Sequence, residues 1–386
     1  MNHQLHSSTI HTHSPRQLKN ASEEHQMSLL QTMDSPNRTV LVTARCHCQR
    51  HHFTASIPAS SLPLHASLCH CTSCRHNTGA LFFSCAVWPN ADEDLSRLKR
   101  YPFSPSTDVF SCAACSSQLF CRDTMAPGQP PEVLTSALEN RPGLVRYSRH
   151  IFVGDTVDGG ASVLLGQWAD GQPLPRWRGH KNSSEELPST WPYGEQDKAE
   201  HGAASLFTRL RCHCKGVNLF LRDAHGMADR PRVVMDARPA ARQSVSADIV
   251  FWARFSMRNI IPDPHMSAAS LFKSERELEM AVSQGDPRIG TLLRDIRPPR
   301  EGQTASTYSC KVCSATFFQV HEGRPDEIFV TLGIMDHPDG ARAQGLVSWG
   351  YAGIVGHGES VGWRRLLCDV ADDAWRGMGS GTYTPI

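Results

Sequence analysis

Three thiols stand close together in the first third of the chain, where residues 69–75 read CHCTSCR and give the spacing C-x-C-x-x-C. Thiolates are preferred zinc ligands, and a closed structural zinc site needs four of them, whereas a catalytic zinc keeps one position open for water or substrate. The segment therefore predicts a zinc site with an open fourth position. Its ligands would be Cys69, Cys71 and Cys74.

The alternative interpretation of this segment is a second structural zinc site that is closed by a fourth protein ligand. The nearby residues that could close it are His70, His76 and Cys85.

Two further sets of cysteines repeat in the same order along the chain. Each combines a C-x-C with a distant C-x-x-C, and together these supply the four thiolates of a complete tetrahedral structural site. The first set is Cys46, Cys48, Cys112 and Cys115, and the second is Cys212, Cys214, Cys310 and Cys313. Because the same arrangement occurs twice, we predict one structural zinc in each half of the chain.

The second half lacks a counterpart of the three-thiol segment. A gap-free alignment that sets Arg75 against Arg242 also puts Trp252 opposite Cys85. The places of the three thiols are then taken by Asp236, Arg238 and Ala241. None of these side chains can replace a thiolate in this geometry, so we expect the open site only in the first half.

The composition indicates a soluble protein of two domains in a reducing compartment. The 386 residues are too many for one ordinary domain, with 40% hydrophobic and 20% charged residues. Of the 14 cysteines, 11 fall in the tight groups, which in the cytosol indicates metal binding rather than disulfides. We expect the other three to be small buried hydrophobic residues. They are Cys85, Cys121 and Cys368.

Charge and hydropathy argue against two classes of partner. A net charge of +1 without a basic run weighs against nucleic acid. No apolar run reaches the length of a membrane span, and the first residues contain no apolar segment that could act as a secretory signal. We therefore expect a cytoplasmic protein, with the nucleus as the alternative. The sequence does not indicate an oligomeric state.

Short β-like runs separated by turn residues predict a mainly β fold in both halves. They cover residues 40–46, 53–57, 65–69, 81–87, 109–112 and 145–153, and then 206–210, 218–221, 232–235, 249–255, 316–320 and 328–332. One helix is predicted over 273–283, and the glycine-rich stretch 353–362 is expected to be a loop.

The predicted domain order follows from these runs and from the proline-rich stretch between the two cysteine sets. We expect a disordered tail over residues 1–39, a zinc domain with the open-site cysteines over 40–168, a linker over 169–204, a second zinc domain over 205–368 and a C-terminal tail over 369–386.

These motifs resemble the glutathione-dependent formaldehyde-activating enzyme family, also called the centromere protein V-like family. The resemblance covers about residues 40–168 and runs through the paired cysteines, CHC at 69–71, CR at 74–75 and TGA at 78–80. The second half looks like a degenerate copy, as in tandem fungal members of this family. The resemblance implies tandem zinc-ribbon-like (Mss4-like) β domains.

The resemblance also implies a zinc-dependent carbon–sulfur lyase that acts on glutathione adducts of formaldehyde or another small aldehyde, similar to S-hydroxymethylglutathione synthase. It implies a structural zinc at the four-thiol set and a catalytic zinc at Cys69, Cys71 and Cys74, which would accept the thiolate of glutathione. Arg75 could bind a carboxylate of glutathione or form a structural ion pair. A proton for the product alkoxide could come from His70, His76 or Arg75.

A second hypothesis is a non-enzymatic zinc-binding interaction module that uses the degenerate half as a docking surface. The chain also departs from the family where glycine usually follows each cysteine pair, because Gln49 and Ser116 stand there. Glycine favours the positive φ of tight turns, so these substitutions question the loop shapes beside the zinc site. The second half keeps a glycine near its C-x-C, at Gly216.

Overall fold

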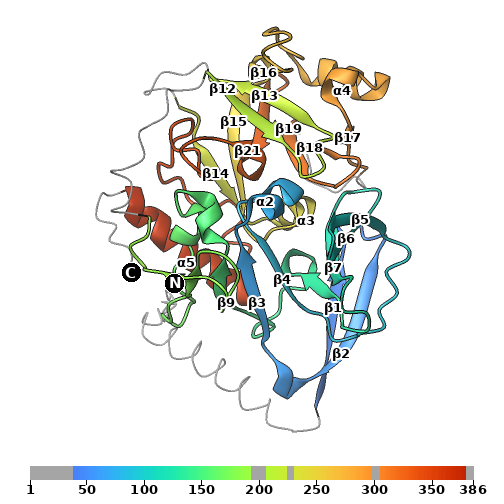
Figure 1. Ribbon diagram of the computed structural model, residues 1–386, viewed down its shortest axis with the longest axis vertical. Helices are drawn as coiled ribbons and strands as arrows, with labels where there is room; N and C mark the ends of the chain where they lie inside the picture. Colours follow the sequence, from blue (N-terminus) through green and yellow to red (C-terminus); the bar gives the residue numbers. More distant parts are fainter. Residues whose placement is uncertain (1–37, 193–205, 224–229, 297–304, 380–386) are drawn as a thin grey trace, which may run out of the picture.

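The computed structural model describes residues 38–192, 206–223, 230–296 and 305–379, and over these ranges the chain is mainly β (Figure 1). This confirms the predicted fold class. The predicted tail over residues 1–39 lies outside the described residues except for its last two positions.

A hairpin and a nine-stranded sheet make up the first half. The hairpin joins β1 (Thr39–Arg45) to β2 (His52–Pro58), and alternate residues of both strands are buried. The sheet has the order β11-β10-β9-β3-β4-β8-β7-β6-β5. Its strands are β3 (Leu64–Cys69), β4 (Phe83–Val87), β5 (Lys99–Ser104), β6 (Thr107–Ser111), β7 (Gln118–Asp123), β8 (Glu132–Leu134), β9 (Val145–Ile151), β10 (Arg176–Trp177) and β11 (Glu186–Leu187).

The second half contains a four-stranded and a six-stranded sheet. The first has the order β16-β13-β12-β21, from β12 (Phe207–Arg211), β13 (Asn218–Arg222), β16 (Ile260–Ile261) and β21 (Met335–Asp336). The second has the order β14-β15-β20-β19-β18-β17. Its strands are β14 (Val233–Asp236), β15 (Val250–Ser256), β17 (Leu292–Arg294), β18 (Ala305–Cys310), β19 (Thr316–His321) and β20 (Glu327–Thr331).

Within the described ranges, the helices are short except for the last one. They are α2 (Thr72–Thr78), α3 (Pro239–Val245), α4 (Glu275–Gln284) and α5 (Gly362–Gly379). The 3-10 turns are η1 (Ala59–Ser61), η2 (Thr135–Ala137), η3 (Val153–Thr156), η4 (Gly160–Val163), η7 (Met257–Asn259), η8 (Pro287–Ile289) and η9 (Leu332–Ile334). Among the described residues, no helix combines the length and apolar character needed to cross a bilayer.

Six strands of the first large sheet have counterparts in the second. The order β3-β4-β8-β7-β6-β5 corresponds to β14-β15-β20-β19-β18-β17. Register agrees as well, because Cys69 pairs with Phe83 just as Asp236 pairs with Val250. The residues that are equivalent in the two sheets are the same ones that the alignment of Arg75 with Arg242 places opposite each other.

The helices that follow β3 and β14 also begin and end at equivalent residues. In α2, Arg75 Nε donates a hydrogen bond to His70 O at 3.2 Å, and in α3 Arg242 Nε donates to Ala237 O at 2.9 Å. The two arginines are both buried. Each therefore holds the strand-to-helix turn that precedes it in the same way.

The two halves share one large hydrophobic core, whose residues extend from Val40 to Trp375 in the sequence. Figure 1 shows α2 and α3 near the centre, between the sheets, where α2 contacts η9 of the second half and α3 contacts β7 of the first. Gly79 ends α2 with φ +91°, and a Cβ there would lie 2.2 Å from Thr316 O. Glycine is needed at this position because the halves pack backbone against backbone.

Two predicted boundaries need correction. Residues 169–192 of the expected linker add β10 and β11 to the sheet beside β9, whereas residues 193–204 lie outside the described ranges. The expected tail over 369–386 contains most of α5, which extends to Gly379. One face of α5 is packed into the core, because its apolar side chains recur every four residues and are buried. These buried side chains are those of Trp363, Leu367, Ala371 and Trp375.

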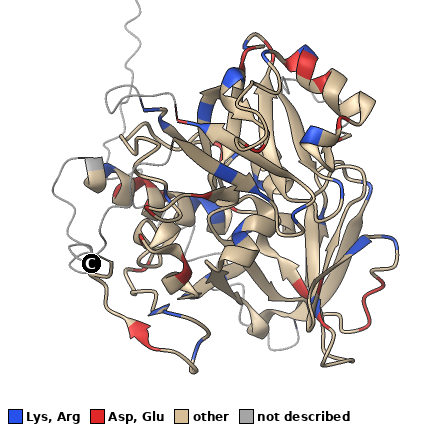
Figure 2. Cartoon of the chain, turned by 45° about the horizontal axis from the view of Figure 1, so that its top comes forward, with Lys and Arg blue, Asp and Glu red and all other residues tan. Residues whose placement is uncertain are grey.

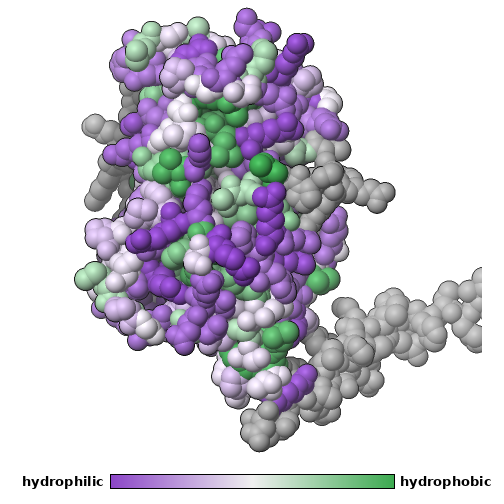
Figure 3. Space-filling model, turned by 90° about the vertical axis from the view of Figure 1, so that its right-hand side faces the viewer, coloured by the Kyte–Doolittle hydropathy of each residue, from purple (hydrophilic) through white to green (hydrophobic). Residues whose placement is uncertain are grey.

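The surface is mixed in charge and hydropathy. Basic and acidic residues are interspersed over both halves in the view of Figure 2. On the face drawn in Figure 3, hydrophobic residues form small patches between hydrophilic ones.

Candidate metal centres

The four cysteines of the first half converge from two loops, one after β1 and one after β6. The Sγ atoms of Cys46 and Cys48 lie 3.5 Å apart, those of Cys48 and Cys112 lie 3.6 Å apart, and all four sulfurs lie within 4.8 Å of one another. Four thiolates at about 2.3 Å from a tetrahedral zinc would be about 3.8 Å apart. The set therefore fits a structural zinc, with Cys115 as its fourth ligand.

The four cysteines of the second half form the same arrangement. Their sulfurs also lie within 4.8 Å of one another, with 3.4 Å between Cys212 and Cys214 and 3.5 Å between Cys214 and Cys310. The N–H of Gly216 donates to Cys214 Sγ at 3.3 Å, and that of Val217 donates to Cys212 Sγ at 3.4 Å. Such donors stabilise thiolates, so this set fits a closed zinc site as well.

The turns beside both sets keep the backbone that glycine would favour. Gln49 has φ 63° and Ser116 has φ 56°, so both residues adopt the positive φ that glycine favours. Their counterparts in the second half are Lys215 at φ 61° and Ser314 at φ 65°. The positive φ of the second C-x-C turn thus belongs to Lys215 and not to Gly216.

The three-thiol segment forms the turn between β3 and α2. Cys69 ends the strand, and Cys71 caps the helix by accepting a hydrogen bond from Cys74 N at 3.2 Å. The three Sγ atoms lie within 4.8 Å of one another, and the cysteines are free thiols. Over the described ranges, no further His, Cys, Asp or Glu side chain joins this group. The geometry fits three zinc ligands with a fourth position open.

The three residues considered as a fourth ligand contact other partners. His70 Nε2 lies 2.9 Å from His150 Nδ1, and His76 Nε2 lies 3.2 Å from Asp336 Oδ1. Burial lowers the pKa of His70 and of His76, so both rings favour the neutral form. Cys85 belongs to a separate group. None of the three therefore closes the site.

The three thiols of this group shift one another's pKa values. Hydrogen bonds with the thiols of Cys69 and Cys74 lower the pKa of Cys71 to about 3. The hydrogen bond with Cys71 raises the pKa of Cys69, and the hydrogen bond with Cys69 raises that of Cys74. A lowered pKa favours the thiolate form, which is the form that binds metal ions.

A cavity of about 340 Å³ lies beside α2, between the two halves. Thr72, Arg75 and Asp155 line it from the first half, and Asp336 and His337 line it from the second. Asp155 Oδ2 accepts a hydrogen bond from Thr72 N at 3.2 Å, directly after Cys71. Asp155 could not be predicted from the sequence, because it belongs to no motif and reaches this turn only through the parallel pairing of β9 with β3.

Arg75 is held mainly by the turn that it supports. Besides His70 O, its guanidinium donates to Thr72 Oγ1 at 3.2 Å and to Asp155 O at 3.4 Å. Because Arg242 makes the equivalent backbone bond in a half without the three thiols, the shared role of this arginine is structural. Arg75 also lines the cavity, so its contact with a glutathione carboxylate stays a prediction.

The comparison with known proteins finds a match within the first half of the chain. Residues 41–155 match the sequence model of the glutathione-dependent formaldehyde-activating enzyme family. The matched segment is similar to this family and makes up less than half of the chain. The match includes both cysteine sets of that half and confirms the resemblance seen in the motifs. A search of the curated proteins finds no match to the chain.

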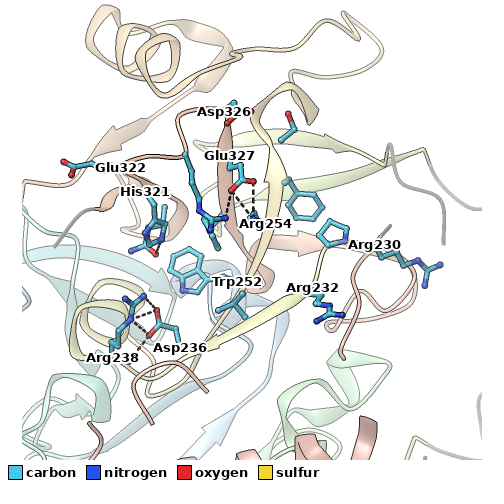
Figure 4. A pocket seen from close by; sticks show the side chains of 17 residues that line it. Arg230, Arg232, Asp236, Arg238, Trp252, Arg254, His321, Glu322, Asp326 and Glu327 are labelled. Carbon is cyan, nitrogen blue, oxygen red and sulfur yellow. Dashed lines mark hydrogen bonds and ion pairs between the residues drawn. The ribbon is translucent and has the colours of Figure 1, made fainter. Parts of the chain in front are cut away.

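Outside the matched segment, an ion pair occupies the position equivalent to two of the three thiols. Figure 4 shows Arg238 and Asp236 pointing toward each other, and Arg238 Nη2 lies 2.6 Å from Asp236 Oδ2. Trp252 and Arg254 line the same pocket, which has a volume of about 830 Å³. The charge of Arg238 is thus neutralised by its neighbour, and the described residues of this pocket contain no cysteine.

Proposed function

We propose that the first half is a zinc-dependent carbon–sulfur lyase that acts on adducts between glutathione and formaldehyde or another small aldehyde. The observation that carries this proposal is the convergence of Cys69, Cys71 and Cys74 with no fourth ligand among the described residues. An open position is what a zinc needs in order to accept a substrate thiol. The family match supports the same reaction class.

The residues around the open site would each have a defined role. Bound zinc would supply the positive charge that favours a substrate thiol as its thiolate. Cys69, Cys71 and Cys74 would hold the ion from one side, because all three belong to one turn. The bond from Cys74 N fixes the Cys71 sulfur in place.

The cavity beside α2 would receive the substrate. Arg75 lines it with a positive charge, which favours a carboxylate of glutathione. Asp155 lines it with a carboxyl group, and we assign Asp155 to proton exchange with the aldehyde oxygen. His70 and His76 are less suited to this task, because their rings are buried against His150 and Asp336.

The second half, in this proposal, is a degenerate copy that keeps the structural zinc. Its strand order, register and helix bounds support this assignment. It would contribute Asp336 and His337 to the wall of the cavity and no thiol ligand to the reaction.

The test uses the full-length protein with glutathione and formaldehyde, and it follows formation of S-hydroxymethylglutathione by NMR exchange spectroscopy. We expect Cys71→Ser to abolish the enzymatic exchange, and Cys368→Ser, which changes a buried cysteine of α5, to retain it. Zinc-loaded wild type that neither binds glutathione nor speeds the exchange would instead favour the non-enzymatic interaction module.

A further inference from the structure

Two cysteines and a glutamate converge on one face of the nine-stranded sheet, apart from the three zinc sets. Cys85 lies in β4, Cys121 in β7 and Glu132 in β8, between them. Glu132 Oε2 lies 3.1 Å from Cys85 Sγ and 3.5 Å from Cys121 Sγ, and the three atoms lie within 4.8 Å of one another. A role as small buried hydrophobic residues, as expected from the sequence, does not explain why both cysteines contact the same carboxylate.

The two cysteines are not placed for a disulfide. Cys121 pairs with Glu132, and Cys85 pairs with Leu134 on the other edge of β8. Neighbouring strands lie about 4.8 Å apart, so the Cα atoms of the two cysteines are about 10 Å apart across β8. Disulfides join Cα atoms that are no more than about 7 Å apart. The convergence of their side chains therefore needs another explanation.

The donor set is that of a zinc site. Two sulfurs and a carboxylate oxygen are ordinary zinc ligands, and distances of about 2.3 Å for Zn–S and about 2.1 Å for Zn–O would place these atoms about 3.6–3.8 Å apart. The observed separations need only small side-chain shifts to reach this geometry. We propose that Cys85, Cys121 and Glu132 bind a zinc ion, with water in the fourth position on the side where Glu132 is exposed.

The second half provides an internal comparison. Trp252, Gln319 and Phe329 occupy the equivalent positions, since Gln319 pairs with Phe329 as Cys121 pairs with Glu132. These three residues offer no zinc ligand, so the sheet itself does not require a metal-binding set on this face. The thiols and the carboxylate are a property of the first half.

The new site would lie on the same face as the open site. Cys69, Cys74 and Cys85 all pack against one small group of buried side chains. This group consists of Phe83, Val109, Cys121 and Leu134. The inference does not depend on the proposed lyase activity, because its ligands are separate from the three thiols at the α2 turn.

The experiment counts zinc in the full-length protein by mass spectrometry, after dialysis against a weak chelator. We expect Cys121→Ser and Glu132→Ala each to lose one equivalent of zinc relative to wild type, and Cys368→Ser to lose none. Glu132 is exposed, so Glu132→Ala keeps the fold intact even if Cys121→Ser disturbs it. In the cobalt-loaded protein, Cys121→Ser should also reduce the thiolate-to-cobalt charge-transfer absorption.

The two open sites can be separated in the same measurement. Cys71→Ser should remove one equivalent by itself, and the Cys71→Ser/Cys121→Ser double variant should remove two. An unchanged zinc count in Glu132→Ala overturns this inference, whether or not Cys71→Ser loses zinc. A loss in Glu132→Ala with no loss in Cys71→Ser supports it and argues against the proposed function instead.

Discussion

Tyr147 of the first half donates a hydrogen bond to Asp248 of the second, with 2.6 Å between Tyr147 Oη and Asp248 Oδ2. The other carboxylate oxygen, Oδ1, lies 2.9 Å from Nε of Arg364 on α5. Arg364 also donates to Leu138 O of the first half at 3.0 Å. One buried network therefore joins both halves and the C-terminal helix.

The first prediction is that Arg364→Met lowers the free energy of unfolding by about 3–5 kcal/mol, because it leaves Asp248 as an unpaired buried charge. Arg365→Met is the matched control, since Arg365 pairs with Asp369 at the surface and such pairs contribute about 0–1 kcal/mol. Urea unfolding of both variants measures the difference. Equal effects of the two substitutions would contradict the buried network.

The second prediction concerns the structural and open zinc sites. Cys212→Ser should strongly lower the temperature of unfolding, because structural zinc contributes on the order of 10 kcal/mol in zinc-finger peptides. Cys71→Ser should lower it little, since serine can also cap the N-terminus of α2. Differential scanning calorimetry compares the two. If Cys71→Ser destabilises the protein as much as Cys212→Ser, the three-thiol site is structural.

The third prediction concerns acid stability. Burial lowers the pKa of His150 to about 3, and its neutral ring bonds to Leu165 O and His70. Because an unfolded histidine has a pKa of about 6.5, protons bind the unfolded chain first as the pH falls. The contribution of His150 to stability is therefore full above about pH 6.5 and is lost as the pH falls from there toward 3.

Urea unfolding at pH 7 and pH 5 tests this effect. Wild type should be less stable at pH 5, and His150→Gln should show a smaller difference between the two values. The charged and titratable groups that face His150 are Arg176 and His70, which the variant leaves in place. A His150→Gln protein with the wild-type pH dependence would place the acid-sensitive group elsewhere.

The parts predicted well from the sequence are those that depend on local spacing. Each C-x-C or C-x-x-C motif and each short β run consists of residues that are near neighbours in the chain, and the family match covers the cysteine motifs of the first half. The sequence did not predict Asp155 near the three thiols, or Cys85, Cys121 and Glu132 near one another. In both cases strand pairing, and not spacing along the chain, brings the residues together. The helix α5 did have a regular apolar pattern, but the acidic and basic residues between Trp363 and Trp375 obscured it.

The last prediction tests the equivalence of the two halves directly. If Asp236, Arg238 and Ala241 stand where the three thiols stand, then the variant Asp236→Cys/Arg238→Cys/Ala241→Cys rebuilds the C-x-C-x-x-C turn before α3. The ion pair between Asp236 and Arg238 is removed as a unit, so neither charge is left unpaired. The full-length variant should bind one more equivalent of zinc than wild type.

The matched control for this gain is Asp236→Ser/Arg238→Ser/Ala241→Ser, which makes changes of similar size without thiols and should keep the wild-type zinc count. In the cobalt-loaded cysteine variant, charge-transfer absorption should rise with the added sulfur ligands. The backbone before α3 is already suited to this site. The helices α2 and α3 begin and end at equivalent residues, and Arg242 donates to the preceding turn the same backbone hydrogen bond that Arg75 does. A folded cysteine variant that binds no additional zinc would show that the two turns differ in shape, and it would argue against the second half as a degenerate copy.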